Sequence, residues 1–217
     1  MYNQNMQKIT YVIFHGAYGN ANGNWFPYLK KNLLKLNQEV IIEQYPVEDL
    51  DQVEKTGKTF LPTKQTLSNW MQIFEQKTFP RLKDKKLCFV GHSLGPVFIL
   101  HLVQKYDFKL KCAIFVMPFM QAFDLENAWQ FDVVNKSFYK SNFDFSKLKK
   151  NIPLSYVVYS DNDPYVKADL ALTFAHELGS SPILIKNAFH INAPLFEKNP
   201  LVLELCKTIL DPSEYLK

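Results

Sequence analysis

The chain has 217 residues, of which 47% are apolar and 21% are charged, and its formal net charge is +4. This length fits one domain, and this composition supplies a large buried core, which excludes a chain that is disordered throughout. The small positive excess is spread over many short stretches, which disfavours a nucleic-acid-binding protein.

Six short runs rich in β-branched and aromatic residues alternate with longer stretches of helical spacing. In chain order, the predicted strands are 9–14, 39–44, 86–90, 112–117, 154–160 and 182–185. The predicted helices are 24–36, 64–77, 94–106, 167–178 and 199–209. Such alternation is typical of parallel strands joined by helical crossovers. The sequence therefore predicts the α/β fold class, with a six-stranded, mainly parallel sheet flanked by helices on both faces, in a single domain over residues 1–217.

Two predicted connections, 46–63 and 119–152, are longer than most loops of compact domains, and long connections often carry function. The second contains eight aromatic residues between Phe119 and Phe145, too many for a solvated loop. One interpretation is an irregular segment that covers the sheet edge. The other is a short, cap-like connection that walls an apolar substrate pocket.

The cysteines, the start of the chain and two basic runs indicate where the protein is located and which partners it binds. Three cysteines without paired spacing are typical of reduced core residues. The polar start of the chain is followed by only five apolar-rich residues, 10–14, too few for a signal peptide or a membrane span. We expect a cytoplasmic protein with no membrane or nucleic-acid partner. The basic runs 83–86 and 147–150 are interpreted as solvated turns, with a phosphate-binding patch as the alternative.

The strongest motif is Gly91-His92-Ser93-Leu94-Gly95, which matches G-x-S-x-G. It lies between a predicted strand and a predicted helix, which is the context in which this motif presents a nucleophilic serine on a strained turn. The glycines avoid clashes with the neighbouring backbone in such a turn. We therefore expect Ser93 to be a nucleophile.

A serine nucleophile needs a base, and His190 is the best candidate among five histidines. The others are His15, His92, His101 and His176. His92 is disfavoured as a base because it is adjacent to Ser93, His101 because it lies about two helical turns beyond it, and His176 because it lies within a predicted helix. His15 ends the first predicted strand, where we expect it to form a wall of the site. His190 follows the last predicted strand, where a loop can bring it to the serine.

The base needs an acid that fixes its tautomer. In hydrolases that carry this motif on a strand-to-helix turn, the acid lies between the serine and the histidine in chain order. Two carboxylates, Asp161 and Asp163, follow the fifth predicted strand. Asp163 is preferred because it directly precedes a proline turn, whereas Asp161 is suited to shaping the turn; both remain candidates.

The tetrahedral intermediate needs amide donors for its oxyanion. We expect these to be the main-chain N–H groups of Leu94, next to the nucleophile, and of Ala17, in the loop after the first strand. The candidate substrate-pocket residues are His15, Tyr18, Phe119 and Trp129. No H-E-x-x-H pattern or cysteine cluster indicates a metal site, and we expect no cofactor.

The chain resembles the α/β hydrolases, and more closely the compact serine hydrolases related to retinoblastoma-binding protein 9. The resemblance covers nearly the whole chain and rests on five segments: 12–16, 25–29, 90–95, 163–166 and His190. It implies a six-stranded parallel sheet without a large lid, and a triad of Ser93, Asp163 and His190. Phe189 departs from the family pattern, in which glycine commonly precedes the histidine. The L-x-C-x-E motif of retinoblastoma-type binding is absent, so that partner is not carried over.

These observations predict a serine hydrolase that cleaves esters of small acyl groups through an acyl-enzyme, with amides and thioesters as further candidates. The alternative belongs to another class: a catalytically silent domain of the same fold whose aromatic segment 119–145 binds a protein partner.

Overall fold

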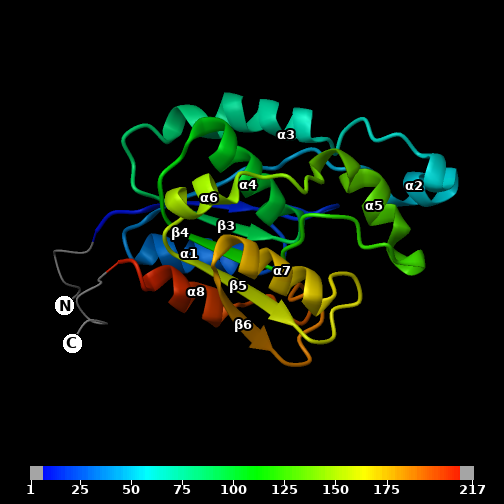
Figure 1. Cartoon of the computed structure of the whole chain (residues 1–217). Coiled ribbons are helices and arrows are strands. Elements are labelled where there is room, and N and C mark those ends of the chain that lie inside the picture. The colour runs from blue at the N-terminus through cyan, green and yellow to red at the C-terminus, as the bar shows by residue number, and fades with distance from the viewer. Residues whose placement is uncertain (1–6, 211–217) are drawn as a thin grey trace.

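All six predicted strands are present in the computed structural model, which describes residues 7–210. The strands are β1 (Thr10–Phe14), β2 (Glu39–Ile42), β3 (Leu87–His92), β4 (Leu110–Val116), β5 (Ser155–Ser160) and β6 (Ser181–Ile185). They form one parallel sheet in the order β2-β1-β3-β4-β5-β6 (Figure 1). The predicted fold class is therefore confirmed, and each strand end lies within two residues of its prediction. Residues 1–6 and 211–217 of the predicted domain lie outside the described residues.

Helices cover both faces of the sheet. They are α1 (Phe26–Lys35), α2 (Leu50–Thr56), α3 (Leu67–Ile73), α4 (Leu94–Tyr106), α5 (Trp129–Asn135), α6 (Phe145–Asn151), α7 (Ala168–Leu178) and α8 (Pro200–Lys207). Short turns of 3-10 helix occupy Gly57–Thr59, Phe79–Arg81, Glu126–Ala128 and Lys136–Phe138, and a π-helical turn, Phe74–Thr78, continues α3. Helices α1 and α8 pack together below the sheet in the view of Figure 1, whereas α4, α6 and α7 pack in sequence on the other face.

Three helices, α2, α5 and α6, lie in connections where the sequence analysis predicted none. Each has only seven residues, too few to show a clear helical period. Asp49 and Asp144 cap α2 and α6 by accepting hydrogen bonds from main-chain N–H groups three residues on. Helix α5 has no side-chain cap and relies on the burial of Val134 and Asn135. Tertiary packing therefore fixes the long aromatic connection.

The core is densest where the central strands meet α4. Every residue of β1 and β3 is buried, and α4 buries nine of its thirteen residues, because it crosses the sheet beneath further helices instead of facing solvent. The carboxyl ends of β1, β3, β5 and β6 meet at one edge of this rigid sheet, which is where parallel α/β folds place their functional loops. Among residues 7–210, no helix combines the length and apolarity that crossing a membrane requires.

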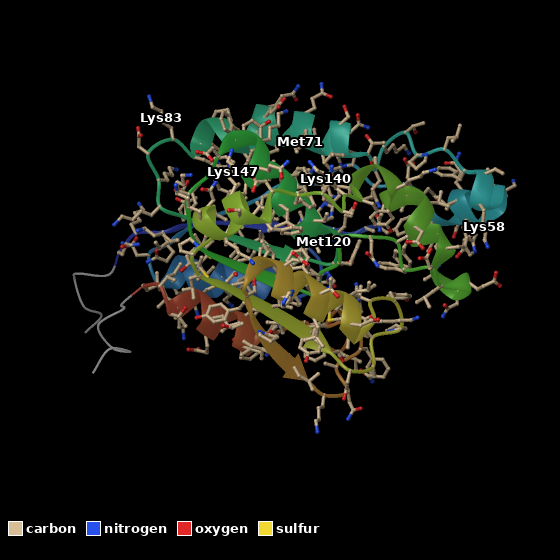
Figure 2. The ribbon with its side chains drawn as sticks, viewed as in Figure 1. Lys58, Met71, Lys83, Met120, Lys140 and Lys147 are labelled. Atoms are coloured by element: carbon tan, nitrogen blue, oxygen red, sulfur yellow. The ribbon has the colours of Figure 1, made fainter. Side chains whose placement is uncertain are left out.

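The two basic runs lie in different surroundings. Residues 83–86 form the turn before β3, as predicted, but residues 147–150 lie within α6, so the second run is not a turn. Lys85 pairs with Glu39 at 2.7 Å and Lys147 with Asp107 at 3.1 Å. Figure 2 shows Lys83 and Lys147 on separate elements. Acidic partners thus offset part of each run's charge.

Candidate active site

Ser93 lies in the sharp turn between β3 and α4. Its φ of 58° and ψ of −104° place it in a strained conformation that few residues other than glycine adopt. The N–H of Ser93 donates to the main-chain oxygen of Val116 at 2.9 Å, which ties the turn to the end of β4. A Cβ at Gly95 would lie 2.6 Å from the main-chain oxygen of Phe14, so only glycine permits this approach to β1. The sheet thus enforces the serine's strained backbone.

His190 lies beside Asp163, although 27 residues separate them in the chain. The distance from His190 Nδ1 to Asp163 Oδ2 is 2.5 Å, and the Asp163 side chain is fully buried. Asp163 Oδ1 accepts hydrogen bonds from the N–H groups of Tyr165 and Val166, at 2.7 and 2.9 Å. Because the carboxylate accepts, Nδ1 carries the proton, and the Nε2 lone pair is left free to take another.

Asp161 lies on the same turn but contacts a different group. Its Oδ1 accepts from the N–H of Asn187 at 2.7 Å. Of the two carboxylates that the sequence left open, Asp163 contacts the ring of His190, while Asp161 contacts the main chain of the loop that carries it. The turn after β5 therefore holds both the histidine side chain and its backbone.

The loop 187–191, which carries His190, contains no helix or strand. Asn187, Phe189 and Ile191 all have positive φ, between 49° and 56°. At Phe189 this conformation explains why glycine is common there in the family that the sequence resembles. Where this irregular backbone is buried, at Ala188, His190 and Ile191, it needs hydrogen-bond partners from elsewhere in the molecule.

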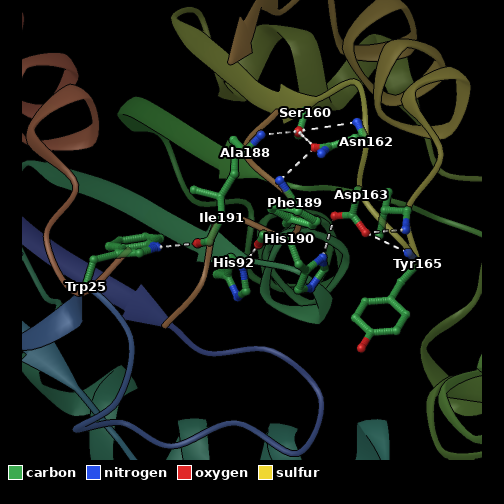
Figure 3. A network of polar contacts seen from close by, with 11 residues as sticks. Trp25, His92, Ser160, Asn162, Asp163, Tyr165, Ala188, Phe189, His190 and Ile191 are labelled. Atoms are coloured by element: carbon green, nitrogen blue, oxygen red, sulfur yellow. Dashed lines mark hydrogen bonds and ion pairs between the residues drawn. The ribbon is translucent and has the colours of Figure 1, made fainter. Parts of the chain in front are cut away.

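Side chains from three segments supply those partners (Figure 3). The N–H groups of Asn187, Ala188 and Phe189 donate to Asp161 Oδ1, Ser160 Oγ and Asn162 Oδ1 at 2.7, 3.0 and 2.8 Å. The main-chain oxygens of His190 and Ile191 accept from His92 Nε2 at 2.9 Å and Trp25 Nε1 at 3.0 Å. His190 is therefore held by its backbone as well as by Asp163.

His92 was disfavoured as a base in the sequence analysis, and the structure shows what it contacts instead. It is enclosed between the sharp turn 91–95 that carries Ser93, which we call the elbow, and the His190 loop, and burial lowers the pKa of His92 to about 3. The nearby His190 acts in the same direction. His92 is thus neutral at physiological pH, with its proton on Nε2, where it can donate to the His190 carbonyl. Single-sequence reasoning gave no signal for this role, because the contact spans 98 residues.

The loop after β1 lies against Ser93. A Cβ at Gly16 would lie 2.7 Å from Ser93 Cβ, so Ala17, the next residue, is within the serine's neighbourhood. Leu94 is the first residue of α4, where N–H groups lack helical partners and the dipole favours negative charge. Ala17 and Leu94 are therefore both positioned near Ser93, as the oxyanion hypothesis requires.

His15, a candidate pocket residue, is fully buried behind this loop. Its Nδ1–H donates to the main-chain oxygen of Gly16 at 2.8 Å, and its Nε2 accepts from the N–H of Tyr45 at 3.0 Å. Burial lowers the pKa of His15 to about 4, outweighing these hydrogen bonds. His15 therefore connects the loop to the chain beyond β2.

Glu48 and Gln65 were not identified from the sequence, yet they brace the same loop. Gln65 Oε1 accepts from the N–H of Tyr18 at 3.0 Å, while its Nε2 donates to Asn135 at the end of α5. One oxygen of the buried Glu48 accepts three consecutive N–H groups, those of residues 63 to 65. The position of Glu48 in the long connection 46–63 is the one sequence signal that could have indicated this.

The other candidate pocket residues differ in exposure. Phe119 is fully buried, with its ring 4.6 Å from that of Phe123. Tyr18 and Trp129 are half-buried, the first beside the Gly16 loop and the second at the start of α5. Among residues 7–210, no group of three or more histidine, cysteine or acidic side chains is arranged to hold a metal ion.

Comparison with known proteins identifies a family that matches the sequence and solved structures with a similar fold. The family model described as "Serine hydrolase" matches residues 11–195. No curated protein matches the sequence. The ydeN gene product of B. subtilis superposes with a TM-score of 0.75 and 21% identity, covering 94% of this chain and 98% of that one. Est1E of Butyrivibrio proteoclasticus, solved with ferulic acid, superposes with a TM-score of 0.62 and 14% identity, covering 99% of this chain and 92% of that one. The hydrolase olei00960 of Oleispira antarctica superposes with a TM-score of 0.61 and 12% identity, covering 93% of this chain and 91% of that one.

Proposed function

Because the chain belongs to the serine hydrolase family, we propose that it cleaves esters of small acyl groups, with amides and thioesters as further candidates, through an acyl-enzyme on Ser93. The observation that carries this proposal is the 2.5 Å contact between His190 and the buried Asp163, in a loop whose His190 carbonyl is bound by His92, the residue before Ser93 on the strained elbow. Neither residue type alone would indicate catalysis. Together with the elbow they supply a nucleophile, a base and an orienting acid.

In the proposed reaction, Ser93 Oγ attacks the substrate carbonyl carbon while His190 Nε2 takes the hydroxyl proton. Asp163 stabilises the imidazolium and keeps Nδ1 as the donor. When the tetrahedral intermediate collapses, the bond to the leaving group breaks and His190 returns the proton to that group. Water then attacks the acyl-enzyme by the same steps, which releases the acid and restores Ser93.

The N–H groups of Leu94 and Ala17 are proposed to stabilise the oxyanion. Support comes from the place of Leu94 at the start of α4 and from the close approach of Gly16 to Ser93. Removing one such donor typically costs about 10²–10³ in kcat. Main-chain donors cannot be deleted by side-chain substitution, so their role is tested by substituting the residues that hold their loop in place.

The silent-domain alternative has less support from the aromatic connection. Four of its rings are buried in the core and are thus not available to a partner: Phe119, Phe123, Phe138 and Phe143. A cytoplasmic location stays part of the proposal and is supported by the three cysteines, all free and buried.

The test is labelling with a fluorophosphonate probe, with the adduct located by peptide mass spectrometry, alongside hydrolysis of p-nitrophenyl acetate. We expect the wild type and Ser141→Ala, a matched control on an exposed serine, to be labelled and active. Ser93→Ala should lose both labelling and hydrolysis while keeping its melting temperature. Hydrolysis by folded Ser93→Ala at the wild-type rate would refute the nucleophile assignment.

A further inference from the structure

Three aromatic side chains from separate segments form a continuous row that ends at His190. The ring centroids lie 5.5 Å apart for Tyr18 and Phe131, 4.8 Å for Phe131 and Tyr165, and 5.3 Å for Tyr165 and His190. Tyr18 follows Ala17, Phe131 belongs to α5, and Tyr165 follows Asp163 by two residues. We call Tyr18, Phe131 and Tyr165 the aromatic wall. The wall extends from the loop after β1 to the pair of Asp163 and His190, and its middle residue belongs to the long connection 119–152.

Main-chain contacts hold the two ends of the wall in place. The N–H of Tyr18 donates to Gln65, and its hydroxyl donates to the main-chain oxygen of Gln130 at 3.3 Å. The N–H of Tyr165 donates to Asp163 at 2.7 Å, and Figure 3 shows its ring beside His190. The elements that position the proposed catalytic groups therefore position these rings as well.

Phe131, at the centre of the wall, is supported from the core. Its ring centroid lies 6.2 Å from that of Phe123, which packs at 4.6 Å on the buried Phe119. This stack gives Phe131 a rigid backing, yet Phe131, Tyr18 and Tyr165 all remain half-buried. Partly exposed rings fixed next to a reactive centre offer apolar surface to a bound molecule.

The wall is also uncharged. The Tyr18 hydroxyl is used by Gln130, and burial raises its pKa, with the carboxylates of Glu48 and Glu54 adding to the effect. A surface of three neutral rings favours an apolar, ring-bearing group, which it can contact by edge or face. It offers little to a charged or strongly hydrated one.

We propose that the aromatic wall binds an apolar ring of the substrate and that Phe131 is its main specificity-determining residue. This inference rests on the proposed function and deepens it, since it names the chemical class of the bound group. It keeps Tyr18 from the sequence-predicted pocket and adds two residues: Phe131, an aromatic of the connection that was interpreted as a possible cap, and Tyr165, which was not among the pocket candidates.

The test compares methanesulfonyl fluoride with phenylmethylsulfonyl fluoride, two reagents that differ in one phenyl ring. With either, Ser93 Oγ forms a bond to sulfur, the S–F bond breaks, fluoride leaves and His190 accepts the serine proton. In Phe131→Ala we expect the second-order rate constant for the phenyl reagent to fall about tenfold. The rate constant for the methyl reagent should stay within about twofold of wild type. The tenfold change corresponds to about 1.4 kcal/mol, which is a reasonable size for the loss of one aromatic contact.

Phe131→Leu keeps apolar volume and guards against a folding defect, and we expect it to lose about half of the effect on a logarithmic scale. Phe79→Ala is the matched control: Phe79 is 40% exposed and packs on Tyr106 and Phe108, away from the wall. It should leave the ratio of the two rate constants unchanged. Equal losses for both reagents in Phe131→Ala, or no loss for either, would overturn the inference.

Two isomeric esters then locate the ring. Methyl phenylacetate carries it on the acyl side and benzyl acetate on the alcohol side. A selective fall of kcat/KM for either isomer in Phe131→Ala supports the wall and assigns the side, whereas unchanged values for both contradict it. Should folded wild-type protein fail to react with either sulfonyl fluoride at Ser93, the proposed function itself would fall, a result distinct from an unselective wall.

Discussion

The Nε2–H of His92 donates a hydrogen bond to the main-chain oxygen of His190 over 2.9 Å, so the residue that precedes the serine holds the loop of the proposed base. The two rings also pack edge to face, with centroids 4.9 Å apart. The elbow therefore positions both Ser93 and the histidine that is proposed to activate it.

His92→Leu should lower kcat about fivefold with little change in KM, because a neutral hydrogen bond is worth about 1 kcal/mol and the loop would lose one anchor. His92→Gln should recover most of the rate, since its amide offers a donor at a similar reach. Steady-state kinetics with p-nitrophenyl acetate will show this, with the exposed His176→Gln as control. Equal activity in the Leu and Gln variants would argue against a positioning role.

Asp163→Asn should reduce kcat by about 10³–10⁴ because the amide favours the wrong tautomer of His190. Asp161→Asn should cost less than about fivefold, since its remaining carbonyl oxygen still accepts from the N–H of Asn187. The two variants form a matched pair on one turn, measured by single-turnover hydrolysis. If Asp161→Asn shows the larger loss, the assignment of the acid is wrong.

Glu48→Ala should destabilise the fold by about 3 kcal/mol, because three consecutive N–H groups would lose a charged acceptor in a buried site. The exposed Glu54→Ala serves as control and should change stability by less than about 0.5 kcal/mol. Urea unfolding followed by circular dichroism will measure both. Similar midpoints for the two variants would show that this carboxylate does not brace the connection.

As the pH is lowered from about 6.5 to about 4, the free energy of unfolding should decrease, partly because of His15. Burial lowers the pKa of His15 from 6.5 to about 4 in the folded state, so the unfolded chain binds more protons across this range and acid favours unfolding. From pH 7 to pH 5 this amounts to about 2 kcal/mol, at 1.36 kcal/mol per pH unit.

The free energy of unfolding of His15→Gln, measured in urea at pH 7 and pH 5, should therefore drop by about 2 kcal/mol less than that of wild type. His176→Gln, whose side chain is 89% exposed, should behave as wild type does. A drop in His15→Gln as large as in wild type would mean that His15 is not held neutral in the fold.

The sequence by itself determined the fold class, the strands and the elbow, because these depend on local patterns. Alternation of apolar runs with helical spacing was enough to place each strand within two residues. The motif around Ser93 was readable because a strained turn demands small neighbours, and Gly95 indeed approaches the main chain of β1.

Only the tertiary structure decided which groups meet. Asp161 and Asp163 are two residues apart and alike in sequence, and their partners are set by the packing of the turn after β5 against the loop after β6. The bond between His92 and His190 joins residues 98 positions apart. Likewise, Tyr18, Phe131 and Tyr165 form one wall only because two loops and α5 converge at the sheet's carboxyl edge. Such long-range contacts leave no periodic trace in a single sequence, since each depends on the geometry of the whole sheet.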